Sequence, residues 1–193
     1  MQDHPARYHR RSIRLRGYGY AGNGAYFVTI CTANRACILS KVDSSAVGAG
    51  LAPALDDETS PVIIHLTKAG EIVKRNWLAI PERYPNVFLD EYVIMPNHLH
   101  GIIMILSKVS RATARVAPTL GQMIGAFKSR CVTDYLKYID ENKVAEVGRI
   151  WQRNDYEHVI RNEADMARTR EYTLLNPDRW ADDEENPDNI HKR

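Results

Sequence analysis

The sequence predicts an α+β fold in which one antiparallel β-sheet carries helices on one face. Short runs of β-branched and aromatic residues recur along the 193-residue chain, as in a sheet of short strands. Two of these runs are joined by a proline–asparagine pair, which favours a tight antiparallel turn. A later stretch spaces its apolar residues as an amphipathic helix does. The length suits one domain with a sizeable core.

The first strand is expected over Tyr26–Thr32, after a glycine–asparagine–glycine sequence. A short second strand is expected over Ala36–Leu39. Residues 43–60 are rich in alanine, glycine, serine and aspartate, a composition that indicates an exposed loop. Val62–Leu66 has strand composition again and leads into the first helix.

Thr67 is suited to cap that helix, which is expected over Lys68–Ile80 until Pro81 ends it. Val87–Met95 and Leu99–Leu106 have the most pronounced strand composition in the chain. Because the proline–asparagine turn separates them, we expect these two strands to pair antiparallel as neighbours in the sheet.

Residues 107–117 are expected to form a basic loop, with Pro118 opening a long helix behind it. The apolar residues of that helix recur at intervals of three and four positions: Leu120, Met123, Ile124, Phe127, Cys131 and Tyr135. This stripe predicts an amphipathic helix that packs on the sheet.

A last strand is expected around Arg149–Ile160, followed by the helix with the clearest start and stop signals. Asn162 is a suitable N-cap with Asp165 three residues later, and Asn176–Pro177 marks the end. The predicted order of elements is therefore β-β-α-β-β-α-β-α.

The formal net charge is only +2, from 26 lysines and arginines against 24 acidic residues, but the charges are unevenly distributed. In residues 1–25 arginines alternate with aromatic residues, a pattern that suits phosphate contacts and stacking on exposed bases. The arginines expected to bind nucleic acid are Arg10, Arg11, Arg14 and Arg16. Lys128 and Arg130 flank the apolar stripe of the long helix and extend this basic surface.

The domain itself is expected over residues 26–180, followed by an acidic tail over residues 181–193. We expect the tail to stay away from phosphates, or to compete with them for the basic surface.

The three cysteines form no Cys-x-x-Cys pair, so neither a disulfide framework nor a zinc knuckle is indicated. The start of the chain has no apolar stretch of the kind found in secretion signals. The apolar run Gly101–Leu106 is far too short to cross a bilayer. These features predict a cytoplasmic protein that does not bind membranes.

His98 and His100 lie two positions apart in a predicted strand, so both imidazoles face one side while Leu99 faces the core. Two neutral imidazoles at that spacing can share a divalent cation with further oxygen or nitrogen ligands. The alternative is that they are two polar residues on a solvent-exposed face.

Tyr172 lies on the polar side of the last predicted helix, where Asn176 is its neighbour one turn later. A tyrosine that only packs in the core would more often lie on the apolar side. A nucleophilic tyrosine needs a metal ion or a proton acceptor close by. The alternative is that Tyr172 merely covers surface.

Five segments taken together resemble the REP-associated tyrosine transposases, which are single-tyrosine HUH endonucleases related to short insertion-sequence transposases. They are Tyr26–Thr32, Tyr92–Ile103, Phe127–Arg130, Ile150–Asn162 and Arg170–Pro177. The Pro-Asn-His-x-His turn and the later Tyr-x-x-x-Asn-Pro are the most specific parts. The likeness extends from about Arg10 to Pro187.

This resemblance implies a ferredoxin-like fold with the two histidines on a central strand. It implies that His98, His100 and Asn176 hold Mg²⁺ or Mn²⁺, and that Tyr172 on the C-terminal helix is the nucleophile. The implied activity is that of an endonuclease and strand-transferase that forms a 5′-phosphotyrosine intermediate. The implied partner is single-stranded or hairpin DNA from repetitive palindromes, bound by a monomer or homodimer associated with the nucleoid.

Two other functions are compatible with the same residues. The first is a DNA-hairpin binding module with little cleavage, which the complete histidine and tyrosine motifs count against. The second is a metal-dependent hydrolase of small phosphoesters built on His98 and His100, which leaves the arginine–aromatic segment unexplained.

Overall fold

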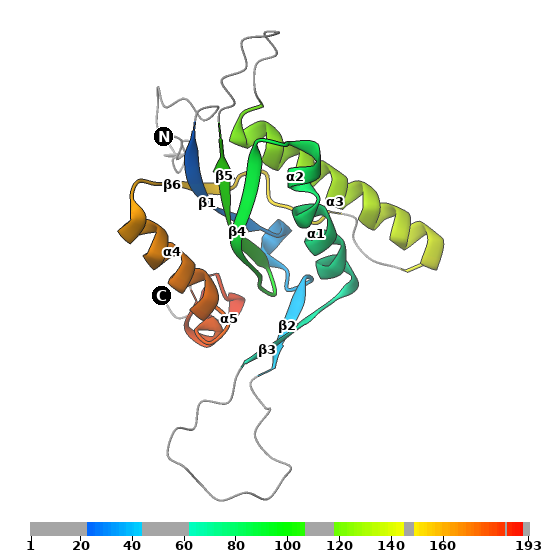
Figure 1. The fold of residues 1–193 in the computed structure, drawn as a ribbon. Coiled ribbons are helices and arrows are strands. Elements are labelled where there is room, and N and C mark those ends of the chain that lie inside the picture. The colour runs from blue at the N-terminus through cyan, green and yellow to red at the C-terminus, as the bar shows by residue number, and fades with distance from the viewer. Residues whose placement is uncertain (1–22, 44–61, 107–117, 145–148, 184, 191–193) are drawn as a thin grey trace, which may run out of the picture.

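The centre of the molecule is a four-stranded antiparallel sheet with the strand order β4-β5-β1-β6 (Figure 1). The computed structural model describes residues 23–43, 62–106, 118–144, 149–183 and 185–190. The strands and the two helices between them are β1 (Gly24–Cys31), α1 (Lys68–Leu78), β4 (Val87–Ile94), β5 (His98–Ile105), α3 (Leu120–Asn142) and β6 (Tyr156–Ile160). This βαββαβ arrangement is ferredoxin-like, so the predicted fold class is confirmed.

Helices α1 and α3 cover one face of the sheet (Figure 1). Alternate residues of β1 and β5, such as Ile30 and Leu99, are fully buried under them. All six apolar residues predicted to line α3 are buried as well. Trp77 of α1 packs directly on β5, where a Cβ added to Gly101 would lie 2.3 Å from the indole ring. Only glycine at that position therefore lets the indole lie against the strand that carries the histidines.

Helix α4 (Glu163–Leu175) lies on the opposite face of the sheet, across β4 and β5 (Figure 1). The apolar cluster on that face is small, with Phe27, Ile102 and Ile160 buried and Met166 packed against them. Within α4 itself only Thr169 and Thr173 are buried. Apolar packing is therefore a minor part of what holds this helix to the sheet.

The remaining elements are short: η1 (Ala33–Arg35), β2 (Ser40–Asp43), β3 (Ile63–Leu66), α2 (Ile80–Arg83), η2 (Trp180–Asp182) and α5 (Pro187–Ile190). Strands β2 and β3 pair with each other in a separate two-stranded sheet. The prediction of a strand over Ala36–Leu39 is wrong. The Leu39 amide there bonds the Pro96 carbonyl in the turn before β5, and the strand begins only at Ser40.

Two helix boundaries differ from the prediction, and both lie next to a proline. Neither proline has the position in its helix that the sequence predicted. Helix α1 ends at Leu78, and Pro81 lies in the first turn of α2. Helix α3 begins after Thr119, one residue beyond Pro118. The Thr119 hydroxyl accepts a hydrogen bond from the Gln122 amide, and the Gln122 side chain accepts one from the Thr119 amide.

The predicted strand around Arg149–Ile160 is shorter than expected, because only Tyr156–Ile160 pairs with β1 over several residues. Trp151 forms an isolated bridge with Thr32. Between them the chain turns its Gln152 and Asn154 carbonyls toward the Lys128 ammonium group. Those carbonyls bind a side chain rather than a neighbouring strand.

Some expectations concern residues that lie outside the described part of the chain. They include the N-terminal arginines and nearly all of the two expected loops, over residues 43–60 and 107–117. Among the described helices, none combines the length and the apolar character needed to span a bilayer.

Candidate active site

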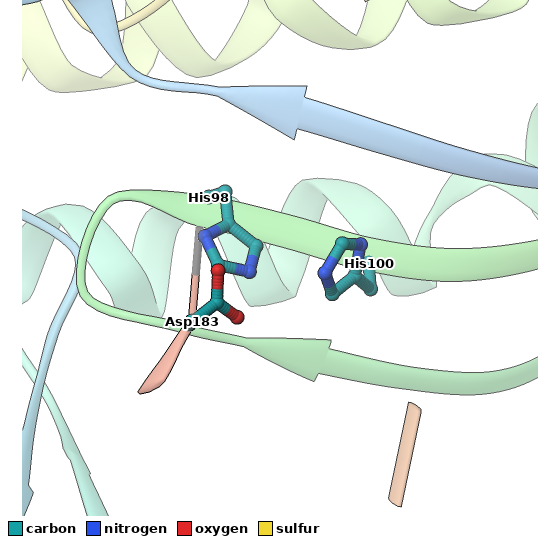
Figure 2. A group of neighbouring side chains, drawn as sticks. All are labelled: His98, His100 and Asp183. Carbon is teal, nitrogen blue, oxygen red and sulfur yellow. The ribbon is translucent and has the colours of Figure 1, made fainter. Parts of the chain in front are cut away.

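His98 and His100 point to the same side of β5, on the face opposite the α1–α3 core, while Leu99 lies in that core. Figure 2 shows the two imidazole rings side by side on one strand, and their centroids are 4.4 Å apart. Both residues are almost fully buried, with exposed fractions of 0% and 3%. The predicted orientation is confirmed, and the alternative of a solvent-exposed face is wrong because α4 and the segment after it cover the pair.

The Nδ1 nitrogen of each imidazole contacts a polar neighbour. His98 Nδ1 lies 2.8 Å from Asn97 Oδ1, and His100 Nδ1 lies 2.9 Å from the Thr29 hydroxyl. Phe27 stacks on the His100 ring with a centroid distance of 5.1 Å. His98 Nε2 is buried and has no hydrogen-bond partner in the described structure.

The environment favours the neutral form of both histidines. Burial lowers the pKa of His98 to about 4, although the Asp183 carboxylate and the Asn176 side chain oppose that shift. Burial also holds the pKa of His100 well below its usual range, and the neighbouring His98 adds to the effect. A neutral imidazole keeps the lone pair that a metal ion requires.

Tyr172 lies on α4 with its hydroxyl 3.5 Å from His100 Nε2. Its ring meets Phe27 edge-on at a centroid distance of 5.9 Å, and 42% of the residue stays exposed. The helix starts where predicted, because the Asn162 side chain accepts a hydrogen bond from the Asp165 amide. The predicted nucleophile thus lies between the histidine pair and solvent.

Asn176 is the residue at which α4 ends, and its side chain points back toward the histidines. It is 2% exposed, and its Nδ2 donates a hydrogen bond to Asp183 Oδ2 at 3.1 Å. Its Oδ1 is a second buried acceptor without a hydrogen-bond partner in the described structure. The structure therefore brings together all four residues named from the sequence: His98, His100, Tyr172 and Asn176.

Asp183 also belongs to this cluster, and sequence reasoning missed it. It follows η2, whose Trp180 ring lies 6.1 Å from the His98 ring. One oxygen of Asp183 and one nitrogen of each histidine all lie within 4.8 Å of one another (Figure 2). The only signal in the sequence is an acidic residue shortly after the Tyr-x-x-x-Asn-Pro motif, in a stretch interpreted as a tail.

This set of donors fits a divalent cation. Burying an acceptor without a partner is unfavourable, and His98 Nε2 and Asn176 Oδ1 are two such acceptors at one place. A cation would satisfy both at once. Imidazole nitrogen combined with amide and carboxylate oxygen is a set that accepts Mn²⁺ or Mg²⁺.

A cleft of about 1720 Å³ opens beside the cluster, and His100, Tyr172 and Asn176 line part of it. Such a volume exceeds the 300–1,000 Å³ that is typical of small-molecule pockets. Its lining includes five basic side chains (Arg35, Lys128, Arg153, Arg168 and Arg179) and five acidic ones (Asp155, Glu157, Asp182, Asp183 and Glu185). The volume of the cleft suits a ligand larger than a typical small molecule.

The two described residues predicted to bind nucleic acid lie in different surroundings. The Lys128 ammonium group donates to Asp155 at 2.9 Å and lies 3.4 Å from two loop carbonyls, at the wall of the cleft. Arg130 is exposed on α3 and is not part of the cleft lining. DNA binding by Lys128 and Arg130 stays a prediction.

Polar contacts hold α4 and the segment after it against the rest of the protein. Arg170 Nε and Nη2 donate to the two carboxylate oxygens of Asp90 on β4, at 2.8 and 2.6 Å. Arg35 forms an ion pair with Glu185, in the segment expected as an acidic tail. The described part of that segment therefore packs against the site.

The comparisons with known proteins come from sequence and from structure. No family model matches the chain. An uncharacterized protein of Haemophilus influenzae is 36% identical over 186 residues, which cover 92% of this chain and 93% of that protein. The structure of a REP-associated tyrosine transposase bound to a REP hairpin matches with a TM-score of 0.51 at 17% identity, over 86% of this chain and 73% of that one.

The structural match agrees with the resemblance found in the sequence motifs and confirms the fold that it implies. The sequence match extends over nearly the whole of both chains. The chain belongs to the same family as the Haemophilus influenzae protein and has the fold of the REP-associated tyrosine transposase.

Proposed function

We propose that this protein is a transposase of the REP-associated tyrosine type, a divalent-metal-dependent endonuclease and strand-transferase for single-stranded or hairpin DNA. The observation that carries the proposal is the position of the Tyr172 hydroxyl, 3.5 Å from His100 Nε2. It lies beside a buried donor set in which His98 Nε2 and Asn176 Oδ1 have no hydrogen-bond partner in the described structure. The lining of the cleft thus combines a candidate nucleophile with a candidate metal site.

Four side chains would hold the cation: His98, His100, Asn176 and Asp183. When bound, a divalent cation polarises the scissile phosphate and neutralises the charge that develops on it. The chain itself orients the participating groups, because Thr29 and Asn97 hold the imidazoles and Phe27 supports the rings of His100 and Tyr172. This preorganisation lowers the cost of reaching the reactive geometry.

Tyr172 performs the covalent step. Its phenol releases a proton, its oxygen forms a bond to phosphorus, and the bond from phosphorus to the 3′ oxygen breaks. The departing 3′ oxygen takes up a proton, which leaves a 5′-phosphotyrosine and a free 3′-OH. Attack by another 3′-OH on the phosphotyrosine reverses these changes and joins two DNA ends without an external energy source.

The cleft supports DNA as the substrate over a small phosphoester. Its volume of about 1720 Å³ leaves room for several nucleotides, and arginines of its lining such as Arg153 and Arg179 are suited to phosphate contacts. The reacting groups make up only a few of its lining residues, so the rest of the cleft is available to flanking nucleotides. Hairpin DNA is the form expected from the resemblance, and the structural neighbour is itself bound to a REP hairpin.

The test is a covalent-adduct assay with labelled hairpin DNA and Mn²⁺. The wild-type protein should form an adduct that resists denaturation, and Tyr172→Phe should form none. Tyr156→Phe is the matched control, because Tyr156 also lines the cleft and is 44% exposed. An adduct in Tyr172→Phe would contradict the assignment of the nucleophile. Tight hairpin binding without cleavage would favour the binding-module alternative.

A further inference from the structure

The side-chain amide of Asn97 is held in one orientation. Asn97 lies in the turn between β4 and β5 and is 1% exposed. Its Nδ2 donates hydrogen bonds to the Arg35 carbonyl at 3.3 Å and to the Glu185 carbonyl at 2.6 Å. Carbonyl oxygens only accept hydrogen bonds, so the nitrogen of this amide must be the atom that faces them.

The orientation of the amide determines where the proton of His98 lies. With Nδ2 directed at the two carbonyls, Asn97 Oδ1 faces His98 Nδ1 at 2.8 Å. An amide oxygen accepts and cannot donate, so His98 Nδ1 must carry the proton in this contact. In a neutral imidazole the other nitrogen, Nε2, then holds the lone pair. This is the buried atom without a hydrogen-bond partner in the described structure.

The second histidine lacks this constraint. His100 Nδ1 contacts the Thr29 hydroxyl, which can either donate or accept a hydrogen bond. That contact is compatible with both tautomers of His100. The Tyr172 hydroxyl at His100 Nε2 can likewise donate or accept, so of the contacts to the two Nδ1 atoms only the one from Asn97 dictates a tautomer.

We infer that Asn97 is a positioning residue that fixes His98 in the Nδ1-protonated tautomer and so directs the Nε2 lone pair toward the candidate metal site. The metal part of this inference rests on the proposed function, whereas the tautomer does not. Groups that hold the non-ligating nitrogen of a metal-binding histidine set both its ring orientation and its basicity. Asn97 acts through His98 and does not itself reach the cation.

Two variants and one control separate this role from ordinary core packing. Asn97→Leu keeps the size of the side chain and removes the acceptor, whereas Asn97→Asp keeps an acceptor oxygen and removes the amide donors. Asn76→Leu is the control, because Asn76 is also a buried asparagine (4% exposed) but bonds Ile72 and Asp134 on the far side of the sheet.

The first measurement is ¹⁵N NMR of the histidine side chains in the metal-free protein at mildly alkaline pH. Wild-type, Asn97→Asp and Asn76→Leu proteins should have His98 protonated at Nδ1, and Asn97→Leu should show Nε2-protonated imidazole. A wild-type or Asn97→Asp protein protonated at Nε2 would overturn the inference, whether or not Asn97→Leu folds. So would an Asn97→Leu protein that keeps the Nδ1 proton.

The second measurement is Mn²⁺ affinity by calorimetry, which needs no DNA and no turnover. Loss of a group that orients a ligand typically weakens metal binding by about 10- to 100-fold, and we expect this for Asn97→Leu but not for Asn76→Leu. Unchanged Mn²⁺ affinity in Asn97→Leu would overturn the link to the metal. If the wild-type protein binds no Mn²⁺, the proposed function fails, while the NMR result still decides the tautomer.

Discussion

Arg170 and Asp90 form a bidentate ion pair. It joins α4, the helix of the candidate nucleophile, to β4, the edge strand of the sheet. Asp90 lies where the pairing of β4 with β5 shifts register, between Leu89 and Tyr92. Arg170 hydrogen bonding lowers the pKa of the Asp90 carboxyl, which favours its charged form. Since α4 buries few apolar side chains, this pair has a large part in setting the position of Tyr172, two residues further along.

Breaking this ion pair should slow the covalent step more than it weakens DNA binding. We expect Asp90→Asn and Arg170→Gln to reduce the rate of adduct formation by about 10- to 100-fold, because small displacements of a reacting group are costly. Hairpin affinity should stay near the wild-type value. The measurement is single-turnover adduct formation beside a binding titration.

Two further variants test whether the displacement of Tyr172 causes the loss of rate. The charge-reversed double variant with Asp90→Arg and Arg170→Asp should recover part of the rate. Arg75→Gln breaks the exposed ion pair to Asp134 that joins α1 to α3 and should leave the rate unchanged. Equal losses in Arg75→Gln and Arg170→Gln would indicate general destabilisation.

The stability of the metal-free protein should fall on acidification between about pH 6.5 and pH 4. Burial lowers the pKa of His98 to about 4, so in this range the unfolded chain binds a proton that the folded protein does not. Each pKa unit corresponds to about 1.4 kcal/mol, so His98 alone accounts for a loss of about 3 kcal/mol. Above pH 6.5 this contribution is constant.

Denaturant unfolding at a series of pH values measures this effect. His98→Gln and His100→Gln should each flatten the pH dependence, because each removes one buried imidazole. Ile124→Val, a change in the α3 core, should lower stability without altering the slope. A wild-type protein whose stability rises on acidification in this range would contradict the buried, neutral histidines.

Mn²⁺ should stabilise the folded protein in the absence of DNA. A ligand at 100 times its Kd that binds only the folded state adds about 2.7 kcal/mol to the free energy of unfolding. Asp183→Asn should weaken the effect by removing one negative charge from the donor set, and His98→Ala should abolish it. Thermal unfolding with Mn²⁺ and with a chelator measures the difference; equal Tm values in the wild-type protein would argue against the metal site.

One chain supplies both the histidine pair and the tyrosine in this structure, since the Tyr172 hydroxyl lies 3.5 Å from His100 Nε2 of the same chain. We therefore expect no complementation when Tyr172→Phe and His100→Ala proteins are mixed. Under the proposed function each should be inactive alone, and an exchanged tyrosine helix would restore one complete site per dimer. Adduct formation in the mixture would indicate that α4 moves to a partner.

Local patterns predicted much of the fold and of the site. The apolar spacing of Leu120 to Tyr135 depends only on helical geometry, and that whole stripe is buried as expected. The alternation along β5 predicted that both histidines share a face. The cap at Asn162 likewise depends on neighbouring residues and is confirmed.

The parts that were not predicted depend on contacts between distant segments. Asp183 joins the site only because η2 and the residues after it fold back, and the Asn97 amide meets a carbonyl 88 residues away in sequence. From composition alone, residues 181–193 are interpreted as an acidic tail. Periodic patterns in the sequence do not indicate that a segment folds back onto a distant strand.

The order of the donors along the chain also has a consequence for how the protein is made. The two histidines share a face of β5 because they lie two positions apart on one strand, whereas Tyr172, Asn176 and Asp183 are translated long afterwards. Chains emerge from the ribosome N-terminus first. Under the proposed function, a product of translation interrupted before Tyr172 therefore carries the histidine pair without its nucleophile, and the ability to cut DNA is acquired only once Asp183 has been synthesised.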